Sequence, residues 1–244
     1  MINWYKDRVL LNCLAGSHEN AKEIYEAGNG YVLVGVLSAN YPDVDSAVKD
    51  MAVYNQEVCG NLSVGLGGGN PNQWKAVADI AREVKANHYN QVFSAVGWTR
   101  ANLGNDEGLI NCLVSHSGVP GQVIISTGPL SSKSEVPVLA DVNTAIAMAR
   151  EMGASSLKFF PMKGLKAKEE LKVLARACGE NDFILEPTGG IDLDNIEEIM
   201  QIIVDGGVRR FVPHVYSSII DKETGNTRVG DVKKIFEIID RVLG

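Results

Sequence analysis

The sequence contains few of the residues that build disulfide frameworks or metal centres. Among its 244 residues there are only four cysteines and four histidines. The cysteines are far apart and form no C-x-x-C pair, a pattern typical of reduced thiols in a cytoplasmic protein. The histidines form no H-x-H or H-E-x-x-H pair, so the local sequence predicts no metal site.

Long apolar runs and excess positive charge are also missing. No stretch approaches the roughly 20 apolar residues of a membrane span, and the N-terminal segment MINWYKDRV has no apolar signal core. The formal net charge of −7 disfavours a nucleic-acid or anionic-membrane surface. We therefore expect a cytoplasmic protein without nucleic-acid or membrane partners. An anionic substrate would need a local positive site.

Short apolar, β-branched runs alternate with longer amphipathic stretches along the whole chain. Near-continuous apolar runs are typical of parallel strands that are buried on both faces. Helical periodicity is clearest over 72–86 and 231–243. The strand candidates are residues 9–14, 31–37, 62–67, 91–96, 122–127, 156–161, 183–188 and 210–215.

The spacing of these runs predicts a single (β/α)₈ TIM barrel over residues 1–244. The strands recur at intervals of about 30 residues, the size of one βα unit, and such barrels take about 250 residues. An open doubly wound sheet is the alternative, but CLAGSHEN after the first strand is not a G-x-G-x-x-G turn. Segments 97–121 and 128–140 are less regular and are expected to form loops over the active face.

Lys158 lies inside the apolar segment SLKFFP. Because side chains alternate along a strand, Ser156, Lys158 and Phe160 should share one face, and Leu157 and Phe159 the other. The apolar pair should face the surrounding helices. Lys158 is then expected to point into the barrel near its C-terminal mouth, where such barrels hold their active sites.

A lysine in that position has two interpretations. Burial disfavours the charged ammonium and lowers its pKa, and a neutral amine is a nucleophile that forms an imine with a ketone. A protonated imine withdraws electrons and permits cleavage of a carbon–carbon bond. Alternatively, Lys158 is ion-paired to a neighbouring strand and has no chemical role. The spacing alone leaves both interpretations open.

A second unusual segment is FILEPTGGI, in which Ile184, Glu186 and Thr188 should share a face. A carboxylate within a buried strand is as unusual as Lys158, and adjacent strands would bring the two together. Glu186 either shuttles protons or pairs with Lys158 or with Arg210.

Gly189 and Gly190 follow at the expected end of this strand. Two glycines let backbone amides approach an anion, and the loops after strands seven and eight are the usual phosphate site of this barrel. A plain turn is the alternative for a Gly-Gly pair.

Taken together, KFFP at 158–161 and PTGGI at 187–191 resemble the paired signature of the 2-dehydro-3-deoxy-phosphogluconate aldolases, Schiff-base (class I) α/β barrels. The stretches ADVNTAIAMAREMGASS and KFFPMKGLKAKEEL resemble the subgroup associated with D-glucosaminate catabolism in bacteria. The resemblance is sharp over about 150–191, and the two motifs are specific only in combination.

The resemblance implies cleavage of 2-dehydro-3-deoxy-6-phosphogluconate to pyruvate and glyceraldehyde 3-phosphate by a homo-oligomer that needs no metal or organic cofactor. It implies an imine at Lys158, contact of Thr188 with the pyruvoyl end, and phosphate binding at Gly189 and Gly190. The sequence departs from the family in one respect, because its first three strands carry no glutamate for acid–base catalysis. Glu186 is the substitute that we expect.

Four further features are weaker candidates for substrate contacts. Arg100 could clamp a carboxylate or form a surface ion pair. His214 either reaches the substrate or is a satisfied core histidine. Ser217, with its neighbour Ser218, could donate to phosphate or face solvent. The glycine-rich run at 65–71 should lie on the catalytic rim, but it lacks the lysine and hydroxyl of a P-loop.

The loop after Lys158 carries three lysines, Lys163, Lys166 and Lys168, which either attract an anionic substrate or form a solvated basic loop. Three rival functions stay open. One is a related 4-hydroxy-2-oxoglutarate-type pyruvate aldolase, and one is a non-catalytic barrel that binds sugar phosphates. The third is a metal-dependent (class II) aldolase, which the lack of a clustered His/Asp/Glu set disfavours.

Overall fold

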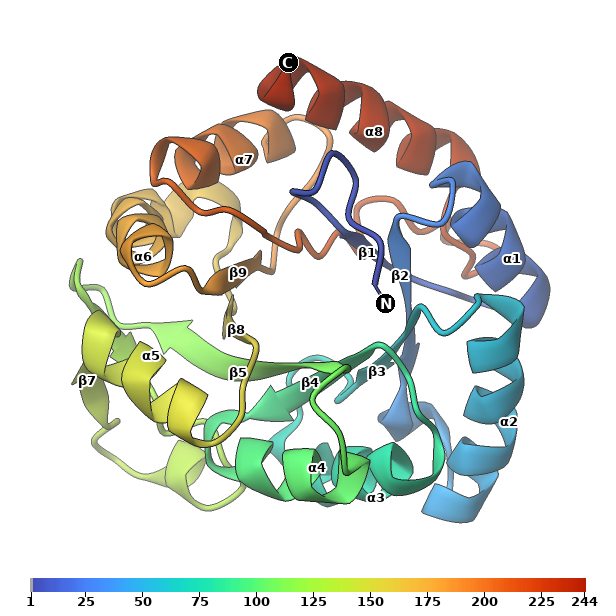
Figure 1. The fold of residues 1–244 in the computed structure, drawn as a ribbon, viewed down its shortest axis with the longest axis horizontal. Helices are drawn as coiled ribbons and strands as arrows, with labels where there is room; N and C mark the ends of the chain where they lie inside the picture. The colour runs from blue at the N-terminus through green and yellow to red at the C-terminus, as the bar shows by residue number, and fades with distance from the viewer. Residues whose placement is uncertain (1) are drawn as a thin grey trace.

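The computed structural model describes residues 2–244, which form a ring of parallel strands surrounded by helices (Figure 1). Seven strands are hydrogen-bonded side by side in the order β1-β2-β3-β4-β5-β8-β9, and every neighbouring pair is parallel. These strands are β1 Leu11–Leu14, β2 Val32–Leu37, β3 Leu62–Gly65, β4 His88–Val92, β5 Leu109–His116, β8 Ser156–Phe159 and β9 Ile184–Pro187.

The eighth position of the ring is occupied by residues 211–214, which form isolated bridges rather than a continuous strand. Phe211 bridges to Val9 on one side and to Leu185 on the other, and His214 bridges to Asn12 and Thr188. Pro213 interrupts this segment and cannot donate a backbone hydrogen bond. The segment predicted as strand eight therefore closes the barrel between β1 and β9, with sparse pairing. The predicted TIM-barrel fold is confirmed.

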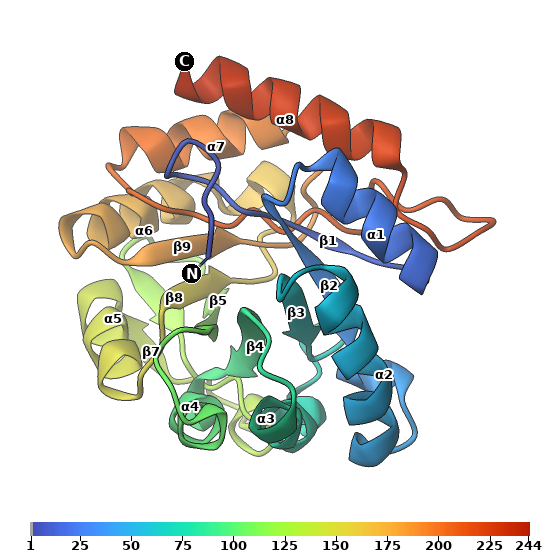
Figure 2. The ribbon, with the colours of Figure 1, turned by 45° about the vertical axis from the view of Figure 1, so that its right-hand side comes forward.

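The helices pack around the outside of the ring (Figures 1 and 2). The periodicity over 72–86 and 231–243 corresponds to helices α3 (Trp74–Glu83) and α8 (Val229–Leu243). No helix within residues 2–244 has the length and apolar character required to cross a membrane. The helices are α1 His18–Ala27, α2 Val44–Glu57, α3 Trp74–Glu83, α4 Val96–Leu103, α5 Val142–Glu151, α6 Lys168–Glu180, α7 Ile196–Asp205 and α8 Val229–Leu243; short 3₁₀ turns are η1 Ser38–Asn40, η2 Pro71–Gln73, η3 Phe93–Ala95, η4 Ser131–Lys133 and η5 Gly164–Ala167.

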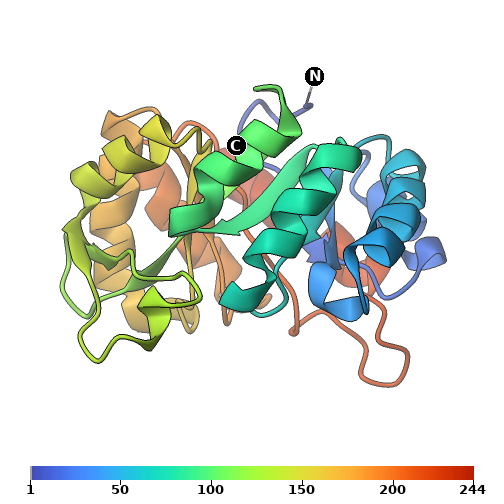
Figure 3. The same cartoon turned by 90° about the horizontal axis from the view of Figure 1, so that it is seen from below.

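Two strand predictions were wrong. The fourth strand is β4, three residues before the predicted start, and 93–96 turns into η3 and α4. The fifth barrel strand is β5, which lies in a stretch predicted to form a loop, whereas the predicted run at 122–127 is only β6 Gln122–Ile124. β6 pairs antiparallel with the end of β5 and with β7 Leu139–Asp141. The most β-branched run thus lies in a peripheral hairpin, which projects on the side away from the N-terminus (Figure 3).

The interior of the barrel changes character along its axis. At the end where the strands begin, Leu10, Leu33 and Val212 form a fully buried apolar cluster. Ile2 and Trp4 of the N-terminal segment pack against this cluster, together with Leu109 and Ile184. About two residues further toward the C-terminal ends of the strands, most inward positions are polar. The polar inward residues are Asn12, Ser63, His88, Asn90, Asn111, Ser156, Lys158, Glu186 and His214, all of them buried.

Candidate active site

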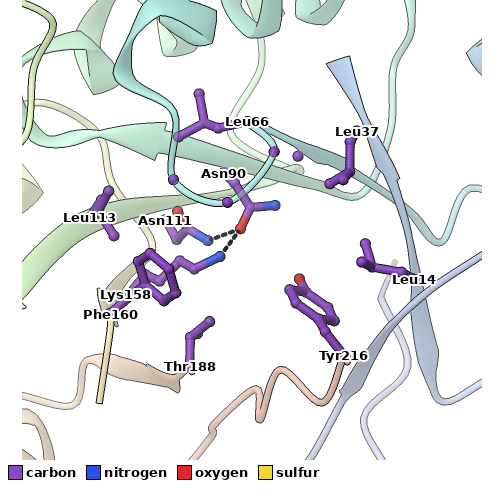
Figure 4. Close-up of a pocket in the computed structure, with 14 residues that line it drawn as sticks. Leu14, Leu37, Leu66, Asn90, Asn111, Leu113, Lys158, Phe160, Thr188 and Tyr216 are labelled. Atoms are coloured by element: carbon purple, nitrogen blue, oxygen red, sulfur yellow. Dashed lines mark hydrogen bonds between the residues drawn. The ribbon is translucent and has the colours of Figure 1, made fainter. Parts of the chain in front are cut away.

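A cavity of about 80 Å³ opens above this polar layer, at the end where the parallel strands finish (Figure 4). This volume exceeds the space that a single water molecule needs, so the cavity can hold a small organic molecule. Its walls are mostly apolar, with a few polar groups converging on Lys158. The lining residues are Leu14, Leu37, Gly65, Leu66, Gly67, Gly68, Gly69, Asn90, Asn111, Leu113, Lys158, Phe160, Thr188 and Tyr216.

Lys158 reaches this cavity from β8, as its alternation with Leu157 and Phe159 predicted. Its Nζ donates a hydrogen bond of 2.7 Å to Oδ1 of Asn90, and it lies 3.4 Å from Nδ1 of His214. Both partners are uncharged groups, and within residues 2–244 Lys158 forms no ion pair. Burial lowers the pKa of Lys158 to about 8, although the negative charge of Glu186 opposes the shift. The amine is therefore far closer to its nucleophilic neutral form than an exposed lysine.

Glu186 is paired in register with Lys158 on the adjacent strand, as expected, but it does not line the cavity. Ser156 Oγ donates to Oε1 over 2.5 Å, and Nδ2 of Asn111 donates to Oε2 over 2.8 Å. The rings of His88 and His214 supply two more contacts, at 3.1 Å and 2.7 Å.

Burial alone raises the pKa of Glu186, but the two histidines outweigh it and hold the pKa well below the ordinary value. Glu186 is thus a fixed negative charge beneath the site. Its geometry does not provide the direct contact with substrate that a proton shuttle needs.

The tautomer of His214 follows from its neighbours. Burial, reinforced by the positive charge of Lys158, lowers the pKa of His214 to about 3, so the ring is neutral near pH 7. Its Nε2 lies 2.7 Å from the ionised carboxylate of Glu186, which can only accept, so Nε2 carries the proton. Nδ1 is therefore an acceptor. It faces the hydroxyl of Tyr216 at 2.7 Å and Lys158 Nζ at 3.4 Å.

His88, Glu186 and His214 are also the types of residue that bind metals, and their donor atoms lie within 4.8 Å of one another. Protein groups already satisfy these atoms. Ser63 Oγ accepts from Asn12 and Asn90, so its own proton goes to Nδ1 of His88, leaving Nε2–H to donate to Glu186. Two further donors occupy the carboxylate, and the trio does not line the cavity. The group fits a hydrogen-bonded network better than an open metal site.

Comparison with known proteins identifies the family. The family model described as KDGP aldolase matches residues 5–223. The chain is also 44% identical, over 98% of its length and 97% of the relative's, to 2-dehydro-3-deoxy-phosphogluconate aldolase from Salmonella typhimurium (strain 14028s / SGSC 2262). The chain belongs to the KDGP aldolase family. This confirms the family inferred from KFFP and PTGGI, and with it a lyase of the aldolase type.

Solved structures resemble this chain in fold only. Thiamine phosphate pyrophosphorylase from Pyrococcus furiosus superposes with a TM-score of 0.60 at 13% identity, and 98% of each chain is covered. The carboxyl transferase domain of Rhizobium etli pyruvate carboxylase gives a TM-score of 0.56 at 13% identity, covering 97% of this chain and 47% of that one. These likenesses support the barrel architecture.

The three residues predicted at the end of β9 differ in their relation to the cavity, because Thr188 lines it whereas Gly189 and Gly190 do not. Thr188 lies near Lys158, just after the strand next to β8 (Figure 4). Gly189 and Gly190 follow with φ of 100° and 72°, values that favour glycine. A Cβ on Gly190 would lie 2.6 Å from the backbone nitrogen of Gly164, so close packing of two loops also requires this glycine.

Other predicted contacts are not brought to the site. The guanidinium of Arg100 bonds to the carbonyls of Gly153 and Gly108, in loops that precede strands, so it braces the opposite end of the barrel. This corrects its expected role as a carboxylate clamp. Ser217 is exposed and does not line the cavity, while Ser218 donates to the carbonyl of Ile191.

The remaining loop candidates divide in the same way. Gly65–Gly69 of the glycine-rich run line the cavity, as expected for the catalytic rim. Lys163 and Lys166 are exposed on a separate surface hollow beside η5, and Lys168 pairs with Glu198.

Sequence reasoning missed six residues of the polar network: His88, Asn90, Asn111, Tyr216, Asn12 and Ser63. The first three lie on strands that were placed wrongly or not at all, so their inward face could not be inferred. Tyr216 follows His214 by two residues, and continued alternation from the eighth segment would have placed both on the same inward side.

Proposed function

We propose that this protein is a class I aldolase that forms an imine between Lys158 and a 2-keto acid and cleaves the adjacent carbon–carbon bond. One observation carries the proposal: a buried lysine amine at the floor of a cavity, bonded to the neutral amide of Asn90 instead of to a carboxylate. A salt bridge would hold the amine in its charged form, whereas Asn90 only orients it.

The same surroundings support the later electron flow. Once the imine has formed and is protonated, a positive charge sits at Lys158, and the fixed carboxylate of Glu186 lies on the neighbouring strand. Such a preorganised charge stabilises the iminium and the transition state that leads from it. When the C3–C4 bond breaks, its electrons enter the iminium to give an enamine, and the C4 carbon leaves as an aldehyde. Protonation and hydrolysis of the enamine release the 2-keto acid.

Reductive trapping tests this proposal. Incubation of the protein with pyruvate and cyanoborohydride should add one reduced pyruvate at Lys158, located by peptide mass spectrometry. Lys166, an exposed lysine in the following loop, is the internal control and should remain unmodified. An adduct confined to exposed lysines, or no adduct at all, rejects a Schiff-base mechanism at Lys158.

For the substrate, we propose 2-dehydro-3-deoxy-6-phosphogluconate, the compound in the name of the Salmonella relative. Gly189 and Gly190 are the proposed phosphate site, since within residues 2–244 their amides have no hydrogen-bond acceptor. Gly190→Ala should raise KM for the phosphorylated substrate more than that for pyruvate. Gly207→Ala is the matched control, because Gly207 has a similar φ of 79° but open space around it. Equal changes in both KM values contradict the phosphate assignment.

We further propose that the protein works in the cytoplasm as a homo-oligomer. All four cysteines are unpaired, which agrees with a reducing compartment. Several large apolar side chains are exposed around the β6–β7 hairpin, including Leu130 at 81% and Val136 at 78%. Exposed apolar surface of this kind marks interaction sites. Light scattering of a Leu130→Ser, Val136→Ser double variant should show a smaller particle than the wild-type protein.

A further inference from the structure

We infer that Tyr216 is the general acid–base of the aldol reaction and that His214 and Glu186 form a relay behind it. The inference rests on the proposed function of Lys158. In this chain the first three strands carry no glutamate for acid–base catalysis. The inference assigns the proton transfers to another residue.

The position of Tyr216 is the first argument. Tyr216 lines the cavity, and its ring lies 6.0 Å from Lys158 Nζ (Figure 4). Its hydroxyl and Nζ both contact Nδ1 of His214, so they lie within about 6 Å of each other. A substrate joined to Nζ as an imine would place C3 and the C4 hydroxyl in the space between the amine and this phenol.

The count of hydrogens is the second argument. His214 Nε2–H is committed to Glu186, so Nδ1 offers a lone pair to the Tyr216 hydroxyl at 2.7 Å. Asn12 Oδ1, at 3.2 Å, is a second acceptor for the same proton. The phenol is therefore the donor within the protein, and its oxygen lone pairs are left to accept a proton from the cavity. Glu186, His214 and Tyr216 form a chain with the logic of a carboxylate–imidazole–hydroxyl triad.

The proton transfers balance along this chain. As the C3–C4 bond breaks, the C4 hydroxyl gives its proton to the phenol oxygen while the phenol passes its own proton to Nδ1 of His214. The products are the aldehyde, the enamine and an imidazolium that Glu186 stabilises. The imidazolium then returns a proton through the phenol to C3 of the enamine, and the relay regains its starting state. No oxidant, reductant or metal enters the cycle.

Exchange of the methyl hydrogens of pyruvate isolates the second transfer, because it requires only the imine, the enamine and a proton shuttle. In D₂O the wild-type protein should replace these hydrogens with deuterium. Proton NMR measures the rate as loss of the methyl signal. Tyr216→Phe keeps the ring and removes the hydroxyl. It should slow exchange by about 10²–10⁴-fold, the usual contribution of a general acid–base, while cyanoborohydride still traps pyruvate on Lys158 at a rate within a few-fold of wild type.

Tyr31→Phe is the matched control, since Tyr31 precedes β2 at the opposite end of the barrel, where it packs against Tyr5. Its exchange rate should equal that of the wild type. Exchange by Tyr216→Phe at the wild-type rate, with the Lys158 adduct intact, overturns the inference and leaves the Schiff-base function standing. Loss of the adduct in Tyr216→Phe alone also overturns it, because Tyr216 would then be needed to form the imine. A wild-type protein that forms no adduct overturns both proposals.

Discussion

The two halves of the barrel interior have opposite chemistry although the same strands build them. The half near the strand starts is closed by the apolar side chains of Leu10, Leu33 and Val212. Two residues further along, the inward positions carry amides, histidines, a carboxylate and Lys158. Apolar packing contributes stability without polar desolvation, whereas each buried polar group costs free energy unless it is hydrogen-bonded. Within the barrel interior, the purely apolar packing therefore lies in one half, and the groups able to do chemistry lie in the other.

The largest expected effect separates activity from stability at Lys158. Lys158→Met keeps the volume and removes both the nucleophile and a buried positive charge. Cleavage should fall by on the order of 10⁵–10⁶-fold, as when a covalent nucleophile is deleted, while the melting temperature stays level or rises. Steady-state assays and thermal unfolding measure the two effects. Lys166→Met, in the exposed loop, should change neither, and a strongly lowered melting temperature for Lys158→Met would contradict a purely functional role.

The next effect concerns the carboxylate at the centre of the polar half. Glu186→Gln removes the negative charge that four neighbouring groups contact. It also replaces one accepting oxygen by an NH₂ group, which then faces hydrogen-bond donors. We expect a loss of about 3–5 kcal/mol in the free energy of unfolding, measured by urea titration. Ser156→Ala deletes one of the four donors to the same carboxylate and should cost only about 0.5–1.5 kcal/mol. Similar losses for both variants would show that the network does not centre on Glu186.

A substitution in the apolar half should have the reverse effect of Lys158→Met, lowering stability while leaving the reaction with pyruvate unchanged. Leu33→Ala opens a cavity in the fully buried cluster and should cost about 2–5 kcal/mol of unfolding free energy. Pyruvate trapping per folded molecule should be unchanged. Leu37, on the same strand and the same inward face, lines the active cavity and is only partly buried. Leu37→Ala should therefore cost less stability but alter trapping, and the opposite result would remove the distinction between the halves.

The smallest effect is a pH dependence. Below the Lys158 pKa of about 8, the neutral amine fraction increases about tenfold per pH unit, so imine formation should accelerate up to pH 8 and then level off. In the ligand-free protein His214, whose pKa is about 3, is neutral across the pH range tested, and the raised pKa of Tyr216 keeps the phenol protonated. Trapping rates from pH 6 to 9 measure the profile. A midpoint near the ordinary lysine value would show that Lys158 is not desolvated.

The sequence predicted those site residues whose charge differs from the apolar strand around them. Lys158 and Glu186 stand out because each is a charge within an apolar strand, and two-residue alternation placed both inside the barrel. The start of β4 was predicted wrongly for the opposite reason. In HYNQV both inward residues, His88 and Asn90, belong to the polar network, so no apolar run marks the strand.

β5 shows the same limit in another form. Its inward Asn111 and the polar end at Ser115 weaken the pattern, whereas the β-branched QVIIST run attracted the prediction although only three of its residues form a strand. The hydrogen bonds among Asn12, Ser63 and Asn90 join residues far apart in the chain. Such contacts depend on strand order and stagger, which a local pattern does not specify. Strand assignment by hydrophobicity thus fails where the barrel is functional.

The apolar floor of the barrel also bears on the order of events in turnover. Ile2, Trp4 and the cluster above them block passage through the base, so ligands enter and leave through the mouth alone. In a cleavage at Lys158 the keto-acid fragment is bonded deepest and the aldehyde lies nearer the exit. The aldehyde must then depart first. For the proposed reaction we therefore expect ordered kinetics, in which pyruvate is a competitive product inhibitor and the aldehyde a noncompetitive one.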